Sequence, residues 1–503
     1  MKNLLLLIIG IFPNLHLMAQ LPEIKWEAPL KGKTGHYILV TEKGYYSFHT
    51  SGKKKITMFD NAGKETTEKD FALQYPDEKA FAKHLVLWPN YEFIQTKQFI
   101  YCFMRFNDFA QKKKQFYASR MSAGLTFGEA KQMSSIPGTF GAIATASDRS
   151  YNHTFKSNNG AMLVNVFFED AASSKPLKNL KLIVFDENLN VKWQKDYSIE
   201  SNEMEELGAK QKSGEYNFAT GDIVDNAFVT NDGNQVVLSL YKDSKREVVL
   251  ATANSSDLKE FDMKLGANRS IERRTFSENP SGLITVVGVF SDVSKKDIKA
   301  SGVFTAILDQ SKLQLSDVAC VAFQGNIVDK LAGLDKSKKI KAVDYNIEGY
   351  NQFEDGGKII LVTRKYLTLS TSSYASGGNT STSYKIENIH CDEHVYMHID
   401  KSGRDNQGVI ENAYTCNSAT LKPVCFAIVK DKVLLSFPLG DCNSMKTNFQ
   451  LWSIDGAGVV KESKLELERY WNLEFCKKLT TDKLLFEADE LMDNFKFGIL
   501  SLP

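Results

Sequence analysis

Apolar and polar residues alternate along much of the chain, and the spacing of three or four residues that marks an amphipathic helix is rare. The clearest stretches run from Val236 to Leu240, Ile284 to Phe290, Ile359 to Thr363 and Val433 to Phe437, and all are rich in β-branched or aromatic residues. A period of two at this length is typical of β-strands. The pattern therefore predicts an all-β protein.

A tight turn precedes each of these stretches. Asn, Asp and Gly are frequent in such turns, because hairpin turns need a positive φ at one or two positions and these residues accept it most readily. The series predicts a row of hairpins at Glu42-Lys43-Gly44, Thr96-Lys97, Asn158-Asn159-Gly160, Asn231-Asp232-Gly233, Pro280-Ser281-Gly282, Asp355-Gly356-Gly357, Lys430-Asp431-Lys432 and Thr481-Asp482-Lys483.

A second series of turns interleaves with the first. Each begins with an apolar residue followed by Asp, and a new strand starts a few residues later. Clear examples are Phe59-Asp60 to Gly63, Phe185-Asp186 to Leu189, Leu308-Asp309 to Leu313, Ile399-Asp400 to Gly403 and Ile454-Asp455 to Gly458. Each unit is therefore predicted to contain two hairpins, or four antiparallel strands.

The last unit, residues 473–503, ends before a fourth strand. A spare strand is predicted near the start of the chain, from Ile24 to Pro29. We expect this strand to complete the last unit, because an open sheet edge would expose unpaired N–H and C=O groups. The ring would then close non-covalently through the two ends of the chain.

Four-stranded units of about 40–50 residues in a row are the sequence signature of a β-propeller. Over residues 21–503 the chain resembles β-propeller repeat proteins in turn spacing and strand pattern, and no specific family motif accompanies the resemblance. The resemblance implies a single closed ring of about eight four-stranded blades. The alternatives are seven blades, or two β domains joined near residues 326–345.

Three segments exceed the repeat. Residues 203–221 are charged and are predicted to form a loop. Within residues 326–345, Ile327, Leu331 and Leu334 have helical spacing, which predicts a short helix on one face of the propeller. Residues 367–384 are rich in Ser, Thr and Gly and are predicted to form a mobile loop.

The first nineteen residues have the pattern of a signal peptide, with Lys2 before an apolar stretch and Ala19 at the predicted cleavage site. We therefore expect an exported protein, periplasmic or extracellular, with no membrane span after cleavage. The whole chain has a formal net charge of +1, and removal of Lys2 makes it neutral. Since affinity for nucleic acid depends largely on positive charge, no nucleic-acid partner is expected.

The densest polar cluster lies between His390 and Asp400 and includes an H-x-x-E-H pattern, His390 to His394. Zinc peptidases place this pattern on a helix, whereas the flanking alternation here predicts a strand. On a strand His390, His394 and His398 would share one face, which makes them a weak candidate metal site. We favour a solvated outer strand, and no metal or other cofactor is expected.

Seven cysteines are present, and export would permit disulfides. If the hairpin turns between Asp400 and Gly408, Cys391 lies opposite Cys416. Opposed residues in a non-hydrogen-bonded pair are close enough for a disulfide. Cys391–Cys416 is therefore the predicted bond.

Polar and aromatic residues cluster where the chain enters the first strand of each unit. In a propeller this strand lines the central channel, and aromatic rings beside amides and paired Arg are common in sugar and peptide sites. Candidate ligand-binding residues are Tyr91, Asn152, His153, Glu272, Arg273, Arg274, Tyr350 and Trp471. The alternative is that the aromatic residues pack between blades and the charged ones are solvated.

No G-x-S-x-G elbow, phosphate-binding loop or EF-hand loop occurs in the chain. We therefore expect a non-enzymatic binding or scaffold protein of the cell envelope that recognises a protein or carbohydrate partner through one face. The alternative is a hydrolase or lyase with catalytic groups scattered around the channel mouth. That alternative requires Glu272, Arg273, Arg274 and His153 to meet in one concave site.

Overall fold

The structure is a computed structural model of the 503-residue chain. The described residues are 24–27, 30–31, 36–50, 54–74, 90–108, 111, 113–137, 152–168, 179–198, 224–242, 245–279, 281–294, 300–332, 340–353, 355–376, 380–416, 425–429, 432–441, 448–455, 460–466, 471–490 and 494–501. The predicted signal peptide and the predicted loop at 203–221 lie outside them.

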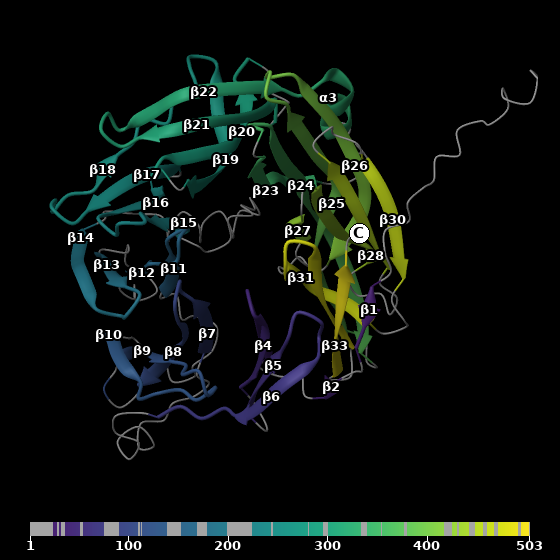
Figure 1. Cartoon of the computed structure of the whole chain (residues 1–503). Helices are drawn as coiled ribbons and strands as arrows, with labels where there is room; N and C mark the ends of the chain where they lie inside the picture. Colours follow the sequence, from purple (N-terminus) through teal and green to yellow (C-terminus); the bar gives the residue numbers. More distant parts are fainter. Residues whose placement is uncertain are drawn as a thin grey trace, which may run out of the picture.

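The chain is an eight-bladed β-propeller. Figure 1 shows the blades as a ring around a central opening, with the first strands inside and the fourth strands outside. Blades 1 to 4 are β3 (His36–Thr41), β4 (Gly44–His49), β5 (Lys55–Phe59) and β6 (Glu65–Asp70); β7 (Asn90–Gln95), β8 (Ile100–Asp108), β9 (Lys113–Arg120) and β10 (Lys131–Pro137); β11 (Asn152–Lys156), β12 (Met162–Phe168), β13 (Asn179–Asp186) and β14 (Val191–Ser198); and β15 (Val224–Val229), β16 (Gln235–Lys242), β17 (Lys245–Thr252) and β18 (Lys259–Glu260).

Blades 5 to 8 complete the ring. They are β19 (Arg269–Glu278), β20 (Ile284–Asp292), β21 (Gly302–Asp309) and β22 (Gln314–Ala322); β23 (Ile340–Gln352), β24 (Lys358–Ser376), β25 (Thr380–Ile399) and β26 (Asp405–Cys416); β27 (Cys425–Val429), β28 (Lys432–Asp441), β29 (Asn448–Asp455) and β30 (Val460–Glu466); and β31 (Trp471–Lys478), β32 (Lys483–Glu490) and β33 (Asn494–Ser501) with the N-terminal β1 (Lys25–Trp26) and β2 (Leu30–Lys31).

The predicted closure through the termini is confirmed. In β1, Lys25 and Trp26 pair antiparallel with Ile499 and Gly498 of β33. In β2, Leu30 and Lys31 pair with Phe495 and Asn494. The first described residues of the chain therefore complete the sheet formed by its last strands.

Each interface between neighbouring blades has its own hydrophobic core, including the interface between blades 8 and 1. Strands such as β12 are apolar at successive positions, because both faces of a blade are covered by neighbours. Between blades 8 and 1, Tyr45 stacks on Phe59 with ring centroids 4.7 Å apart and meets Phe497 edge-on at 5.0 Å. The ring is therefore packed continuously across its non-covalent joint.

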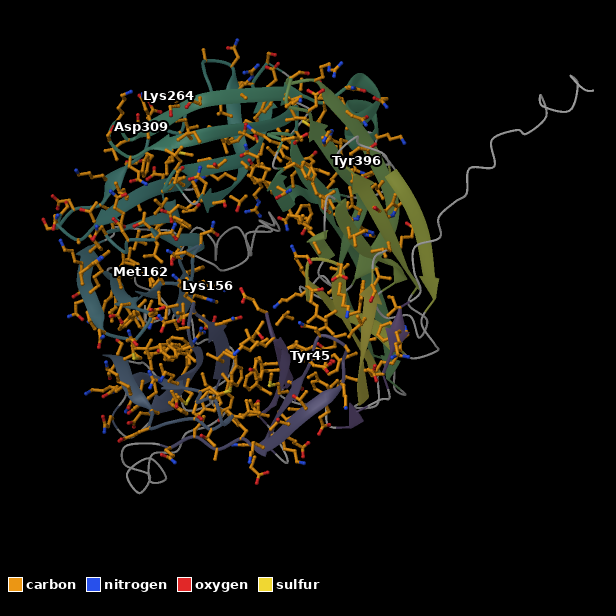
Figure 2. The ribbon with its side chains drawn as sticks, in the orientation of Figure 1. Tyr45, Lys156, Met162, Lys264, Asp309 and Tyr396 are labelled. Atoms are coloured by element: carbon orange, nitrogen blue, oxygen red, sulfur yellow. The ribbon has the colours of Figure 1, made fainter. Side chains whose placement is uncertain are left out.

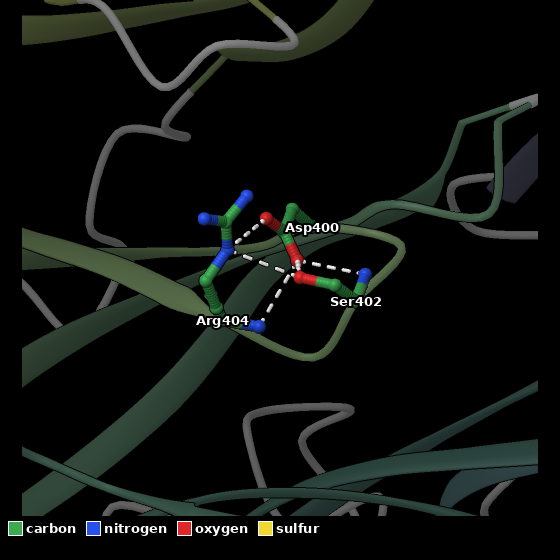
Figure 3. Close-up of polar contacts among 3 residues, drawn as sticks. All are labelled: Asp400, Ser402 and Arg404. Atoms are coloured by element: carbon green, nitrogen blue, oxygen red, sulfur yellow. Dashed lines mark hydrogen bonds and ion pairs between the residues drawn. The ribbon is translucent and has the colours of Figure 1, made fainter.

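The two predicted series of turns lie at the same end of each blade, because neighbouring strands are antiparallel. We call it the turn end, and the opposite end, where the chain enters each blade, the entry end. Asp400 shows how an acidic turn is held: its Oδ1 accepts hydrogen bonds from the backbone N–H groups of Ser402 (2.8 Å) and Arg404 (3.0 Å), and its Oδ2 accepts one from Arg404 Nε (3.0 Å; Figure 3). The Ser402 hydroxyl also donates to Oδ1 at 2.6 Å, and this bond, followed by the others, lowers the pKa of the Asp400 carboxyl.

Two of the inserted segments differ from prediction. The helix exists as α3 (Gly325–Ala332), but residues 340–345 belong to β23 rather than to the insertion. The segment 367–384 is not a loop: β24 and β25 continue through it as a hairpin paired as far as Ser376 and Thr380. The loop was predicted because the segment is rich in Ser and Thr, but Thr is also a good strand former.

Blades 6 and 7 are joined by more than packing. Tyr414 and Thr415 of β26 pair in parallel with Gly440 and Asp441 of β28, which links two blades into one eight-stranded sheet. The sequence gives no signal for this contact, because parallel pairing of distant segments leaves no local turn motif.

Candidate binding site

The predicted ring of polar and aromatic residues is not one surface. Most of its members lie toward the entry end, but Tyr350 pairs with Ile360 close to the first turn of blade 6 and so lies at the turn end. The prediction assumed that the first strand began near this residue, whereas β23 begins at Ile340. Tyr350 also packs against the core between blades 5 and 6, and burial raises the pKa of its phenol.

Tyr91 is a core residue. It is 6% exposed and lies in the cluster between blades 1 and 2, where its ring meets Phe71 edge-on with centroids 5.8 Å apart. For this residue the alternative interpretation, packing between blades, describes the structure.

The charged residues Glu272, Arg273 and Arg274 of β19 form hydrogen bonds with three different strands. Glu272 is the extra residue of a β-bulge between Ile271 and Arg273, and it accepts a hydrogen bond from Ser291 Oγ within the blade. Arg273 Nε donates to the Tyr345 carbonyl of blade 6 at 3.2 Å. Arg274 Nη2 lies 3.5 Å from Ser239 Oγ of blade 4. Successive residues of a strand point to opposite faces, so the two guanidinium groups contact opposite neighbours.

The remaining predicted residues lie at the entry ends of blades 3 and 8. Asn152 pairs with Phe167 and His153 with Val166 in blade 3, and the His153 side chain is exposed. Its ring lies near that of Phe155, with centroids 6.2 Å apart. Trp471 pairs with Glu490 at the start of blade 8, and the side chains of Asn152 and Trp471 lie outside the described residues. His153 therefore belongs to blade 3, whereas the charged side chains of β19 belong to blade 5.

The histidine segment was expected to be a solvated outer strand, but His394 and His398 are buried within blade 6. β25 is the third strand of the blade, and His394 and His398 are 1% and 5% exposed. His394 Nδ1 is 2.7 Å from Thr363 Oγ1. A bulge in β25 between Cys391 and His394 interrupts the alternation that was expected to align His390 with the other two. Within the described residues no three His, Cys, Asp or Glu side chains are placed to hold a metal ion.

The predicted disulfide loses its geometric basis. Cys391 pairs with Tyr414 and Cys416 with Ile389, so the two cysteines are offset by two residues instead of directly opposite. Cys476 is disulfide-bonded, whereas Cys102 and Cys320 are free. The sequence identified the region in which the cysteines concentrate but not this bond.

A buried ion pair anchors helix α3, and sequence reasoning missed it. The Arg364 side chain is 2% exposed, pairs with Glu393, and donates through Nη1 to the Leu331 carbonyl at 2.6 Å and the Lys330 carbonyl at 3.3 Å. The cation thus satisfies carbonyl groups at the C-terminal end of the helix, where positive charge is favourable. Ile327 and Leu331 fix the other side of the helix in the core between blades 5 and 6.

Polar contacts at the turn end connect blades 3, 4 and 5. Glu278 is 3% exposed, and its Oε2 accepts the Asn231 N–H at 2.9 Å. The Asn158 side-chain amide donates to the Glu278 carbonyl, and the Asn159 N–H donates to Asn231 Oδ1 at 3.0 Å. Burial raises the pKa of Glu278. These contacts hold three consecutive turns together at the inner rim of the ring.

Two lysines at the same end, Lys156 of blade 3 and Lys477 of blade 8, were not singled out from the sequence. Both lie near the ends of innermost strands, and both side chains are exposed. Isolated lysines on polar strand ends carry no signal in a single sequence.

Known protein families and curated proteins provide no match to this sequence. Among solved structures, the Dos1 propeller is 8% identical, with 95% of this chain and 96% of that chain covered and a TM-score of 0.43. The polysaccharide lyase Uly1 is 12% identical, with 93% and 90% covered and a TM-score of 0.41. The uncharacterized protein lmo1340 from Listeria monocytogenes EGD-e is 8% identical, with 86% and 98% covered and a TM-score of 0.38.

These similarities concern the fold alone, since one propeller architecture serves many unrelated functions. The class of protein is the β-propeller, defined by its eight blades and the packed interfaces between them. Among the described residues, no helix has the length and apolar character needed to cross a membrane.

Proposed function

We propose that this chain is an exported, non-enzymatic binding or scaffold protein of the cell envelope, which recognises a protein or carbohydrate partner through the entry face of its propeller. The observation that carries the proposal is the separation of the polar groups required by the enzymatic alternative. Glu272, Arg273 and Arg274 bond to three different elements, and His153 lies in another blade. Catalysis needs such groups to be held together around one reacting atom.

The difference between the two ends of the ring supports the entry face as the binding surface. Described turn-end connections are short and tied to one another, as in the bonds from Lys97 N–H to the Gly160 carbonyl (2.9 Å) and from Lys483 Nζ to the Asn61 carbonyl (3.1 Å). Connections at the entry end vary in length along the chain, and include helix α3 and the hairpin extension of β24 and β25. Binding residues are most often carried on variable connections held by a rigid scaffold.

Two features support export. The sequence pattern of residues 1–19 is that of a signal peptide. Cys476 is disulfide-bonded, and disulfides persist mainly in oxidising compartments. Export would make the mature chain a component of the envelope or of the secreted fraction.

The proposal is tested by cross-linked capture from envelope fractions of the native cell, with residues 20–503 as bait. We expect the native chain to capture one reproducible, stoichiometric partner. A His153→Ala/Glu272→Ala variant should capture this partner at a level reduced about tenfold or more. The matched control is Lys43→Ala, which changes an exposed residue at the turn end and should retain the partner fully. Equal retention by the double variant and the native chain would show that this part of the entry face is not the binding surface.

A further inference from the structure

Blade 6 carries a two-stranded extension beyond its four-stranded sheet. Inside the blade, strand β25 is paired on both sides: Tyr396, which Figure 2 labels, pairs with Leu361 of β24 and with Gly408 of β26. Pairing with β26 ends at Ile389. Beyond that point, residues 380–388 of β25 pair with β24 alone among the described strands.

The free edge of this extension is long and is turned away from the channel. At about 3.4 Å per residue, residues 380–388 reach about 30 Å past the end of β26. Strand β23 is the innermost strand of the blade and β26 the outermost (Figure 1). The edge of β25 that continues past β26 therefore faces outward, where another strand can approach it from outside the ring.

The sequence of the extension does little to protect this edge. Proteins commonly shield an exposed strand edge with proline, a bulge or several like charges. Residues 369–388 contain no proline, and their two charged residues, Lys385 and Glu387, have opposite signs. The pairing of the extension contains no bulge. The edge thus presents a regular row of N–H and C=O groups, which an extended polypeptide backbone matches.

The ring already uses strand edges to join separate segments. Tyr414 of β26 pairs in parallel with Gly440 of β28 in the next blade. The N-terminal strand β1 pairs with β33 to close the ring. The first of these joints lies at the same end of blade 6 as the extension, so a further strand on β25 would continue a mode of contact that this blade already has.

We propose that the extension is a dimerisation site, at which residues 380–388 of one copy pair antiparallel with the same residues of a second copy. A two-fold contact uses the same patch on both subunits. A separate peptide would only move the open edge outward, whereas pairing of two copies covers both outward edges. The formal net charge of only +1 gives two copies little long-range repulsion.

The length of the segment fixes the position of the two-fold axis. Pairing centred on Tyr384 uses all of residues 380–388 and leaves β26 of both copies in place. A centre closer to the blade would bring the hairpin of one copy against β26 of the other. In this register Tyr384 lies opposite the same residue of the second copy, and aromatic pairs across strands are favourable. Lys385 and Glu387 lie opposite serines, so like charges do not meet.

Sedimentation velocity of residues 20–503 tests the proposal. We expect a dimer whose fraction rises between about 1 and about 100 µM. Tyr384→Lys should weaken dimerisation about tenfold or more, because it places two ammonium groups opposite each other at the axis and removes the aromatic pair. The matched control is Tyr374→Lys, the same substitution on β24 of the same hairpin, which should leave dimerisation unchanged.

Hydrogen exchange followed by mass spectrometry locates the contact. On dimerisation the amides of residues 380–388 should exchange more slowly, whereas those of residues 369–376, on the other strand of the hairpin, should keep their rates. Tyr384→Lys should restore fast exchange at high concentration without changing the Tm of the monomer, since the substitution lies outside the four-stranded part of the blade.

Three results would overturn the proposal. The first is a chain that stays monomeric at every concentration. The second is a dimer that Tyr384→Lys leaves intact or that Tyr374→Lys weakens equally. The third is a dimer that is lost in Val318→Lys, because Val318 is 42% exposed on the outer strand β22 of blade 5 and its loss would place the contact there. Partner capture at the entry face is measured separately and does not depend on these results.

Discussion

Blades 3 and 8 have the same core architecture but different outer edges. In blade 3 the strands β11 to β14 follow one another in the chain, and β14 pairs with β13 from Asn179–Ser198 to Phe185–Val191. In blade 8 the outer position is shared by β1 and β2, which supply two residue pairs each. The joint that closes the ring is therefore made with much less backbone pairing than an ordinary blade edge.

Side-chain packing compensates for the short pairing in blade 8. Ile24 is 5% exposed and belongs to the core between blades 7 and 8, and Trp26 packs against the same core. The Lys496 ammonium lies 5.1 Å from the centroid of the Trp26 ring, a cation–π contact. The comparison teaches that a propeller edge can be completed by a few well-packed side chains, because burial of apolar area rather than strand length supplies most of the free energy.

The largest effect is expected from removing β33, by ending the chain after Glu490. This strand carries Phe495 and Phe497, which are 0% and 1% exposed, and it is the only described partner of β1 and β2. Without it the edge of β32 and the core between blades 8 and 1 are open. We expect loss of the cooperative thermal transition by calorimetry, whereas a chain shortened only by Leu502 and Pro503 should unfold as the full chain does.

A smaller effect is expected from Gly498→Val, which tests the seam with β33 still present. A Cβ at position 498 would lie 2.5 Å from Ile24 Cγ2 and 2.7 Å from Trp26 Cε3. Overpacking of this kind costs about 1–3 kcal/mol. We expect a loss of this size in the free energy of unfolding, measured by chemical denaturation, together with faster tryptic cleavage after Lys25 and Lys31.

The control for this substitution is Gly325→Ala, since a Cβ at Gly325 would meet no atom within 4 Å. If Gly498→Val left both stability and cleavage unchanged, β1 would not be packed on β33 as the structure has it.

In blade 3 the corresponding test is the substitution of Leu189, which lies in the turn between β13 and β14. Leu189 has a φ of 61°, the left-handed conformation that Gly63 adopts in the matching turn of blade 1, and it is 4% exposed. Leu189→Gly relieves the strain but removes the buried side chain, for a net loss of about 1–2 kcal/mol. Leu189→Ala keeps the strain and also loses the burial, so it should be less stable than the glycine variant. The opposite order in chemical unfolding would show that the leucine is not held by packing.

The smallest effect concerns the charge linkage between blades 8 and 1. Hydrogen bonds from the Lys64 and Ala62 N–H groups, and more weakly the positive charge of Lys483, lower the pKa of Asp60. Because the folded-state pKa is depressed, the stabilisation is present above about pH 4 and is lost as the pH falls through the folded-state value.

Asp60→Asn should therefore reduce the difference in Tm between neutral and acidic pH by a small amount. The same carboxyl-to-amide change away from the seam, Asp355→Asn, serves as the comparison, since the Asp355 carboxylate also accepts a turn N–H (Gly357, 2.9 Å). An unchanged pH dependence in Asp60→Asn would mean that this carboxyl contributes nothing to the seam.

Much of the fold could be predicted because its signals are local. Alternation located the strands, and Asp60 and Gly63 marked a turn that the structure contains, with Gly63 at a φ of 83°. Closure by the N-terminal strand was also predictable, since a repeat that lacks one strand at its end and has one to spare at its start leaves few alternatives. The hairpin at 367–384 was misjudged because composition was given more weight than strand propensity.

The candidate site was less predictable, because side-chain partners come from different blades. Tyr350 was assigned to the wrong end of its strand by an error of several residues in the start of β23. Arg273 and Arg274 were grouped because they are adjacent in sequence, but adjacency on a strand sends their guanidinium groups to opposite neighbours. The bulge in β25 removed the expected histidine face, and the turn that pairs Ile399 with Asp405 set a register in which Cys391 faces Tyr414 instead of Cys416.

The sequence by itself determined the period of the strands, the residues of the turns and the number of repeats, because each depends on φ preferences and side-chain burial over a few positions. The tertiary structure decided which distant residues meet: Arg364 with the end of helix α3, and Asn158 with Glu278. These contacts depend on bulges, on strand starts and on the angle between blades. None of these leaves a pattern within a single repeat, so the chemistry at the inner rim of the ring is a property of the closed ring alone.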